Sequence, residues 1–181
     1  DLGRITRAAK TTVVLVTQDQ DEALALADVL AVIKDGRLLQ YGEPQEIFSR
    51  PASKDVADFV GVETLLNGEV TAKSDNLCSV RVGGDTLEVI SACGPGDKVL
   101  LCVRPEAVSV SKAAEANSMR NHFKGKIISA EPWRLEYRLS IDCGFPLIAA
   151  VTKRSIDELG LKPGDEVLAS FKATAAHLIR R

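Results

Sequence analysis

The stretch PGDKVLLCVR, residues 95–104, returns as PGDEVLASFK at residues 163–172. In both copies a Pro-Gly-Asp turn leads into an apolar strand, and a cation, Arg104 or Lys172, follows the strand. An internal repeat of this kind indicates two copies of one small β-unit. Because each copy is too short to bury a secure core alone, we expect the two copies to pack as a pair.

Short segments of alternating apolar and polar residues surround both copies, with Gly-rich turns between them. Strands at this spacing favour small β-barrels. The polar, Ala-rich residues 112–117 form the predicted linker between the copies. The predicted strands are 67–71, 78–82, 86–89, 98–103 and 107–110 in the first copy, and 125–130, 138–142, 147–151, 166–171 and 176–179 in the second, with a helical turn at 155–159.

Residues 1–61 have a different, α/β character. The β-branched run Thr11–Thr17 predicts a strand covered on both faces. Asp19 followed by Glu22 predicts the start of a helix. Further on, Asp35-Gly36 predicts the turn of a hairpin, and two short helices are predicted at 44–48 and 54–60.

Composition excludes some classes of function. Lys and Arg number 23 against 25 Asp and Glu, for a net charge of -2, so no global basic field attracts nucleic acid. Aromatic residues make up 4% of the chain, too few for a base-stacking surface. The four cysteines show no Cys-x-x-Cys spacing, which predicts core thiols in a reducing compartment and no metal site. With no signal sequence or membrane span in the pattern, we expect a soluble cytoplasmic protein.

Several segments, in order, resemble one family. Residues 14–28 (VLVTQDQDEALALAD) resemble the last core strand and switch loop of ABC transporter ATPases, and residues 35–61 resemble the segment after that loop in the importer branch. Residues 96–110, with VRPE at 103–106, are similar to the TOBE domain of those ATPases. Residues 118–179 resemble the Mop, or molbindin, version of that domain, with SMRN at 118–121, VTKRS at 151–155 and FKAT at 171–174.

The resemblance implies a mainly β fold of tandem OB-like barrels, preceded by an α/β remnant of a nucleotide-binding domain. It places the end of the ATPase domain at 1–61, a first TOBE-like unit at 62–116 and a second, Mop-like unit at 117–181. The implied function is the regulatory C-terminal region of an importer ATP-binding protein for molybdate or tungstate. The implied partners are a second copy and a transmembrane permease, which would hold the protein at the inner face of the plasma membrane.

The sequence contains no Gly-x-x-x-x-Gly-Lys-Ser/Thr phosphate loop and no place for the ABC signature or Walker B motifs upstream. Without these groups we expect that this chain alone cannot hydrolyse ATP, and that ATP and Mg²⁺ belong to a longer parent protein. Gln18 stands where the family has its switch histidine. The alternative interpretation of Gln18 is a polar loop residue before a helix cap.

The Mop resemblance also implies an oxyanion site, which in the molybdate and tungstate members lies between subunits. None of its residues is acidic, and they supply the hydroxyl, amide and charged donors that a tetrahedral dianion needs. For Arg120 and Lys172 the alternative is a solvated cation at a strand end. The implied site residues are Ser118, Arg120, Thr152, Ser155, Lys172, Ala173 and Thr174.

Neighbouring residues have structural interpretations. Ser155 and Glu158 form a predicted capping box, and Asn121 is expected to fix the entrance of its own strand. Arg104 and Glu106 predict a structural salt bridge in the first copy. Trp133 and Tyr137 are expected to fill the core or an interface.

Three other functions stay open. A free oxyanion-binding or storage module is one, although residues 1–61 argue against it because such a module has no use for a switch loop. The TOBE region of a sugar, sulfate or iron importer is the second. A nucleic-acid-binding OB protein is the weakest, given the charge and the aromatic content.

Gln18 gives the first testable prediction. A glutamine amide can donate a hydrogen bond to a γ-phosphate oxygen, but it cannot carry a proton as imidazole does. In the intact parent protein, Gln18→His should therefore raise kcat for ATP hydrolysis and leave nucleotide affinity nearly unchanged. ATP turnover with and without the membrane partner measures this. An unchanged kcat would mean that another residue performs the task of the histidine.

Overall fold

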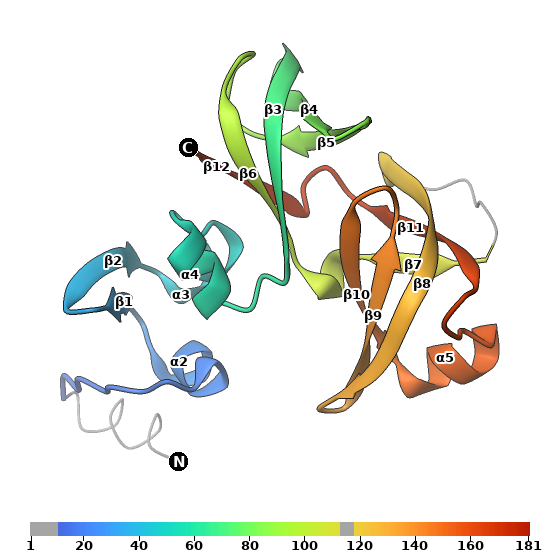
Figure 1. Cartoon of the computed structure of the whole chain (residues 1–181). Helices are drawn as coiled ribbons and strands as arrows, with labels where there is room; N and C mark the ends of the chain where they lie inside the picture. The colour runs from blue at the N-terminus through green and yellow to red at the C-terminus, as the bar shows by residue number, and fades with distance from the viewer. Residues whose placement is uncertain (1–10, 113–117) are drawn as a thin grey trace. The chain divides into compact units, whose positions relative to one another are not determined.

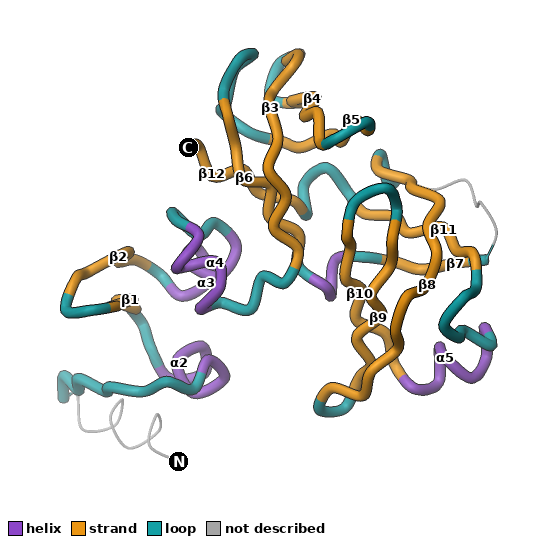
Figure 2. The backbone as a smooth tube through the Cα atoms, viewed as in Figure 1, coloured by secondary structure: helices purple, strands orange, loops and turns teal. Residues whose placement is uncertain are grey.

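The structure, a computed structural model, describes residues 11–112 and 118–181. The chain forms two compact units, Asp1–Val60 and Gly61–Arg181. Strands make up 49% of the described residues and helices 17%, so the fold is mainly β, as predicted. Figure 2 shows that most of these strands lie in the second unit. No helix among the described residues is both long and apolar enough to cross a membrane.

The first unit contains short helices and one hairpin (Figure 1). Asp19 caps the helix that begins at Gln20 by accepting hydrogen bonds from two backbone N–H groups, as predicted. Asp35 and Gly36 both have positive φ, 51° and 72°, which is the geometry of a type I′ hairpin turn. The elements are α2 (Gln20–Leu26), β1 (Leu30–Lys34), β2 (Arg37–Gly42), α3 (Pro44–Ser49) and α4 (Lys54–Phe59).

The strand predicted at Thr11–Thr17 does not form. Val14 is 88% exposed and Val16 is 92% exposed, although their sequence is typical of a covered strand. A strand of this type needs hydrogen-bonded neighbours and layers on its faces. Within the described residues, β1 and β2 pair only with each other, and this segment pairs with neither of them.

The second unit consists of two five-stranded antiparallel sheets. The first sheet has the order β12-β6-β3-β4-β5 and the second β10-β9-β8-β11-β7. Their bounds are β3 (Thr64–Ser74), β4 (Leu77–Val82), β5 (Asp85–Ile90), β6 (Lys98–Val103), β7 (Ser109–Ser111), β8 (Asn121–Trp133), β9 (Glu136–Asp142), β10 (Pro146–Thr152), β11 (Glu166–Phe171) and β12 (Ala176–Arg180). A 3₁₀ turn, η1 (Pro105–Ala107), precedes β7, and α5 (Lys153–Leu159) precedes β11.

The two sheets exchange their last strands. β7 follows the first copy of the repeat but pairs with β11 of the second sheet, for example Val110 with Ala169. β12 follows the second copy but pairs with β6 of the first sheet, for example Leu178 with Leu101. Each sheet therefore needs a strand from the other copy, and one hydrophobic core contains residues of both. The predicted linker, except for Lys112, lies outside the described residues.

The repeated Pro-Gly-Asp turns have the same geometry in both copies. Gly96 and Gly164 have φ of 90° and 95°, which an L side chain rarely adopts. Each donates its N–H over 2.8 Å to a carbonyl, Gly96 to Val70 and Gly164 to Ile127. The two turns thus fasten β6 to β3 and β11 to β8 in the same way.

The aspartate of each turn pairs with the exchanged strand or its end. Asp97 forms an ion pair with Arg180 of β12. Asp165 lies 3.4 Å from the Nζ atom of Lys112, the residue that follows β7. Because Asp165 Oδ2 is buried without a hydrogen-bond partner, this second contact is an ionic one rather than a good hydrogen bond. In each half, the Pro-Gly-Asp turn is therefore paired with the strand supplied by the other copy. The pair at Asp97 is a hydrogen-bonded ion pair, and the contact at Asp165 is a weaker ionic one.

The Asp97–Arg180 pair predicts a pH effect on stability. A hydrogen bond from Arg180 and one from the Gly94 N–H hold the pKa of Asp97 below its ordinary value. A carboxyl group whose pKa is lower in the folded protein stabilises it above its unfolded pKa, about 3.9, and this contribution disappears as the pH falls through the folded pKa. Asp97→Asn should therefore lower the free energy of unfolding at pH 7, and the deficit should shrink as the pH falls below about 3.9.

Urea unfolding of both proteins between pH 7 and pH 2 measures this. Asp157→Asn, at an exposed position of α5, is the matched control and should leave the free energy of unfolding at pH 7 nearly unchanged. A deficit for Asp97→Asn that is the same at every pH would contradict the assignment.

Candidate functional site

The chain crosses between the two sheets twice, and both crossings have the same backbone turn. The first crossing loop comprises residues 104–107 and the second comprises residues 172–175. In the first, the Ala107 N–H donates to the Arg104 carbonyl over 3.0 Å, and in the second the Ala175 N–H donates to the Lys172 carbonyl over 3.0 Å. The cation that the repeat preserves therefore begins each crossing loop.

The second crossing loop contains three of the predicted site residues. Lys172 and Thr174 are exposed, whereas Ala173 is only 6% exposed. The Ala173 carbonyl accepts a hydrogen bond from Ile90 N over 3.0 Å, which holds the loop against the end of β5. The backbone beside Lys172 is thus fixed while the side chain reaches solvent.

Arg120 and Ser118 approach the same place from β8. Asn121 is the partner of Phe171 in the ladder between β8 and β11, so Arg120 and Lys172 leave the sheet together, each just beyond that pair. The Arg120 side chain is 60% exposed and lies 3.3 Å from a carboxylate oxygen of Glu88. Ser118 is exposed as well. Five predicted site residues therefore lie at one end of β8, on two adjacent chain segments.

Glu88 is a neighbour that the sequence did not predict. It belongs to β5, 32 residues before Arg120, and only the tertiary fold places the two side chains together. Exposed ion pairs contribute about 0–1 kcal/mol, so this pair leaves the guanidinium available to a stronger anionic ligand.

Asn121 fastens the entrance of β8, as expected, and does so across the two sheets. The side chain is 2% exposed. Its Oδ1 atom accepts from Glu88 N over 2.8 Å, and its Nδ2 atom donates to the Glu88 carbonyl over 2.9 Å. At the corresponding position of the other half, Thr64 is 2% exposed and its hydroxyl accepts from Ile148 N over 3.0 Å.

His122 is a second residue that the sequence did not single out. Its Nδ1 atom lies 2.9 Å from the buried hydroxyl of Ser170, and its Nε2 atom lies 2.6 Å from the Met119 carbonyl. Since that carbonyl can only accept, Nε2 carries a proton and Nδ1 accepts from the serine in the neutral imidazole. His122 thereby positions the segment between Ser118 and Arg120.

Thr152 and Ser155 lie elsewhere. Thr152 pairs with Glu136, and Glu136 pairs with Trp133, the last residue of β8. Arg120 and Lys172 stand next to Asn121, the first residue of β8. A single chain thus places these two hydroxyl residues at the opposite end of the strand from the two cations.

The capping box predicted for Ser155 and Glu158 is not formed. Thr152 caps α5, with its hydroxyl accepting from Ser155 N over 3.1 Å. The two hydroxyls lie 3.0 Å apart, and Glu158 instead pairs with Arg154 at 2.6 Å. The helix begins two residues before Ser155 because the threonine, and not the serine, ends the preceding strand.

The structure also places the remaining predicted residues. Gln18 is exposed in the bend before α2, next to the capping residue Asp19. Trp133 is 54% exposed and so does not fill the core, and Tyr137 is half-buried. Arg104 lies 3.6 Å from Glu106, which confirms the predicted salt bridge.

The cysteines are free, as predicted. Cys78, Cys102 and Cys143 are buried, and burial raises the pKa of the Cys143 thiol to about 11. A thiol with so high a pKa is not a nucleophile near neutral pH. The described residues contain no group of three or more His, Cys, Asp or Glu side chains that could hold a metal ion.

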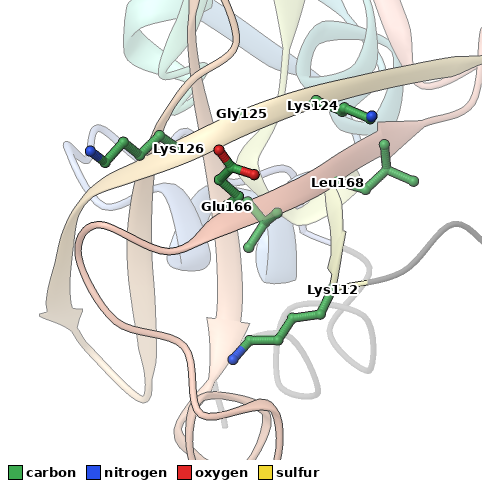
Figure 3. A pocket seen from close by; sticks show the side chains of 7 residues that line it. Lys112, Lys124, Gly125, Lys126, Glu166 and Leu168 are labelled. Atoms are coloured by element: carbon green, nitrogen blue, oxygen red, sulfur yellow. The ribbon is translucent and has the colours of Figure 1, made fainter.

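A shallow hollow lies on the outer face of β8 and β11 (Figure 3). Lys124 and Lys126 of β8 and Glu166 of β11 line it, together with Lys112. Lys112 is engaged there, because it donates to the Gly160 carbonyl over 3.2 Å. None of the predicted site residues contributes to this hollow.

Comparison with known proteins gives a family for part of the chain. Residues 117–178 match the TOBE domain family. A molybdate/tungstate import ATP-binding protein, WtpC of Pyrococcus horikoshii, is 33% identical over 168 residues, covering 92% of this chain and 47% of that protein. A spermidine/putrescine import ATP-binding protein, PotA of Nitrosomonas europaea, is 33% identical over 174 residues, covering 93% of this chain and 48% of that protein. The chain thus spans about half the length of these relatives.

A solved structure is similar as well. The cytoplasmic molybdate-binding protein ModG, determined with molybdate bound, is 25% identical, with a TM-score of 0.57 over 65% of this chain and 95% of ModG. The predicted OB-like, molbindin-type fold is therefore confirmed.

The buried amide of Asn121 gives a stability prediction. Asn121→Ala leaves the Glu88 N–H and carbonyl without partners, at a cost of about 1–3 kcal/mol for each group, so the free energy of unfolding should fall by about 2–6 kcal/mol. Urea unfolding at pH 7 measures the change. Asn67→Ala is the control, because Asn67 is exposed and accepts only from Arg181, and its loss should cost under about 1 kcal/mol. Equal effects of the two substitutions would contradict the role given to Asn121.

Proposed function

The chain is a TOBE-containing relative of the C-terminal region of ABC importer ATP-binding proteins, and we propose that it regulates such an importer by binding a tetrahedral oxyanion of the molybdate or tungstate type. The observation that carries the proposal is the convergence of Arg120 and Lys172 at the Asn121–Phe171 end of the sheet. Ser118, Ala173 and Thr174 add hydroxyl and backbone groups beside these two cations.

The chemistry of this end of the sheet suits an anion. A dianion gains most from charged donors on a backbone that does not have to reorganise when it binds. The hydrogen bond from Ile90 N to the Ala173 carbonyl fixes one side, and the bonds of Asn121 to Glu88 fix the other. The ion pair between Arg120 and Glu88 neutralises only one of the two cations.

A second copy of the chain completes the proposed site. Thr152 and Ser155 are at the far end of β8 and reach an anion at Arg120 and Lys172 only if another subunit supplies them. An anion held between two subunits favours one arrangement of the dimer, to the extent that it binds that arrangement more tightly. Through this dimer, internal oxyanion would inhibit import.

The wider setting is part of the same proposal. The intact protein would hydrolyse ATP with Mg²⁺, would contact a transmembrane permease and would lie on the cytoplasmic side of the membrane. Gln18 would face the γ-phosphate there. These roles rest on the import ATP-binding proteins to which the chain is similar over about half their length.

A different transported solute is the second candidate. The relatives include importers of spermidine and putrescine, which are cations. A polyamine importer requires no anion site in its regulatory region, nor does a sugar or iron importer. The two cations at the second crossing loop favour the oxyanion over a cationic ligand at this place. A stand-alone storage module is disfavoured, because the similarity also covers residues of the first unit.

Thermal unfolding and calorimetry with this chain test the proposal. Molybdate or tungstate should raise the Tm more than sulfate or phosphate at the same ionic strength, because a ligand of the native state stabilises it by mass action. Lys172→Ala should weaken anion binding by about 2–5 kcal/mol, as when a desolvated charge pair loses one member. Lys172→Arg should weaken it too, since a planar guanidinium does not replace a compact ammonium.

Lys162→Ala is the matched control, because Lys162 is exposed before the Pro-Gly-Asp turn at the other end of β11. It removes the same charge and should leave anion affinity unchanged. Equal Tm shifts with all four anions would indicate a nonspecific charge effect, and the absence of any shift would exclude the oxyanion function.

A further inference from the structure

Glu106 in the first crossing loop is held between two guanidinium groups. Its Oε1 atom lies 3.3 Å from Nη2 of Arg138, and its Oε2 atom lies 3.6 Å from Nε of Arg104. The Arg138 side chain is only 16% exposed. A carboxylate that offers one oxygen to each of two arginines makes the contacts by which proteins hold free oxyanions.

The first crossing loop is the structural counterpart of the second. Arg104 corresponds to Lys172 in the repeat, and the turn between residues 104 and 107 has the same 3.0 Å hydrogen bond as the turn between 172 and 175. By the same count, Glu106 corresponds to Thr174. An acid therefore occupies in one half the position that a hydroxyl residue occupies in the other.

The strands that begin beside the two loops also differ in charge between the halves. Thr64 and Asn121 are the corresponding buried residues that begin β3 and β8. The residue before each is Glu63 in the first half and Arg120 in the second. Glu63 lies 2.8 Å from Nε of Arg138, so a second carboxylate reaches the same guanidinium.

The charge balance consequently differs between the halves. Around the first loop, Arg104 and Arg138 meet the carboxylates of Glu63, Glu106 and Glu136. Around the second loop stand two cations, Arg120 and Lys172, and the ion pair seen there among the described residues is the one between Arg120 and Glu88. An added dianion is repelled at the first loop and attracted at the second.

We propose that the first crossing loop is an anion site whose anion is built into the chain, namely the carboxylate of Glu106, so that each chain binds one free tetrahedral oxyanion rather than two. The assignment of the free anion to the second loop rests on the proposed function. A tethered carboxylate acts at a high effective concentration, which a dissolved anion at ordinary concentrations does not overcome. Removal of this carboxylate leaves two guanidinium groups against the two carboxylates of Glu63 and Glu136, so the first loop no longer repels an added anion and the place of the Glu106 oxygens between Arg104 and Arg138 becomes open to the same class of ligand.

Isothermal titration calorimetry of the 181-residue chain with sodium molybdate tests this. Glu106→Thr introduces the residue found at position 174, and the stoichiometry should rise from one to two anions per chain. Lys172→Ala should strongly weaken binding in the wild-type background, and in the Glu106→Thr background it should leave one anion per chain bound with unweakened affinity. Glu106→Gln, which keeps the size of the side chain and removes its charge, should act in the same direction, and thermal unfolding checks that each variant is folded.

Glu69→Gln is the matched control. Glu69 also joins two cations, at 2.7 Å from Lys98 and 3.4 Å from Arg81, but it lies within β3 and away from both crossing loops. Its substitution changes the charge by the same amount as Glu106→Gln and should leave the stoichiometry at one. A rise with Glu69→Gln would show that the gain reflects net charge and would overturn the inference.

The outcomes separate this inference from the proposed function. If the wild type binds one anion per chain and neither Glu106 variant binds more, the inference of a built-in anion is wrong and the proposed site at the second loop is retained. If the wild type binds none, but Glu106→Thr binds one that survives Lys172→Ala, the built-in anion is right and the proposed function is wrong. If no protein binds molybdate, both are wrong.

Discussion

The exchange of β7 and β12 between the two sheets is the constraint on which the rest of the second unit depends. Without the exchanged strand, each sheet would end at β6 or β11, and in both cases the strand that covers this edge comes from the other copy. The chain must therefore cross between the sheets twice. These crossings create the two short loops that carry Arg104 and Lys172, so the position of the preserved cation is a consequence of the way in which the edges are covered.

The backbone of the second unit repeats faithfully, while its surface charges do not. Glu69 pairs in register with Lys98 and Arg81, and the corresponding residue Lys126 pairs in register with Glu166 and Asp142. Each of these three positions therefore carries the opposite charge in the other half. Core positions and turns are under the constraint of packing and backbone geometry, which is the same in both halves. Surface positions are not under this constraint. One crossing loop can therefore carry a net positive charge, while carboxylates offset the cations of the other.

This asymmetry bears on how relatives that import different solutes can share one fold. The chain is similar both to importers of molybdate or tungstate and to importers of spermidine and putrescine. The core, the turns and the crossing loops can stay the same in all of them. On the proposal made for the first crossing loop, an acid in place of Thr174 would fill the anion site of the second loop from within.

The sequence by itself determined the two copies, most strand positions and the family, because turns and alternating patterns are local signals. The Pro-Gly-Asp turns, the Asp35-Gly36 hairpin and the salt bridge of Arg104 with Glu106 all involve neighbours in the chain. Local signals also misled: the run at Thr11–Thr17 has the composition of a buried strand, but a strand forms only where another strand offers hydrogen bonds. The Thr152 cap was missed because the end of β10, and not the capping pattern, decides where α5 begins.

Only the tertiary structure decided which strands cover which edges and which side chains meet. Arg120 and Glu88 are 32 residues apart, and Arg138 and Glu63 are 75 apart, so no local pattern could pair them. The same holds for the separation of Thr152 and Ser155 from Arg120 and Lys172, which depends on the length and register of β8. A repeat in sequence predicts that two halves share a backbone. Whether both halves share a function depends on charged residues that lie far apart in the sequence and that only the fold brings together.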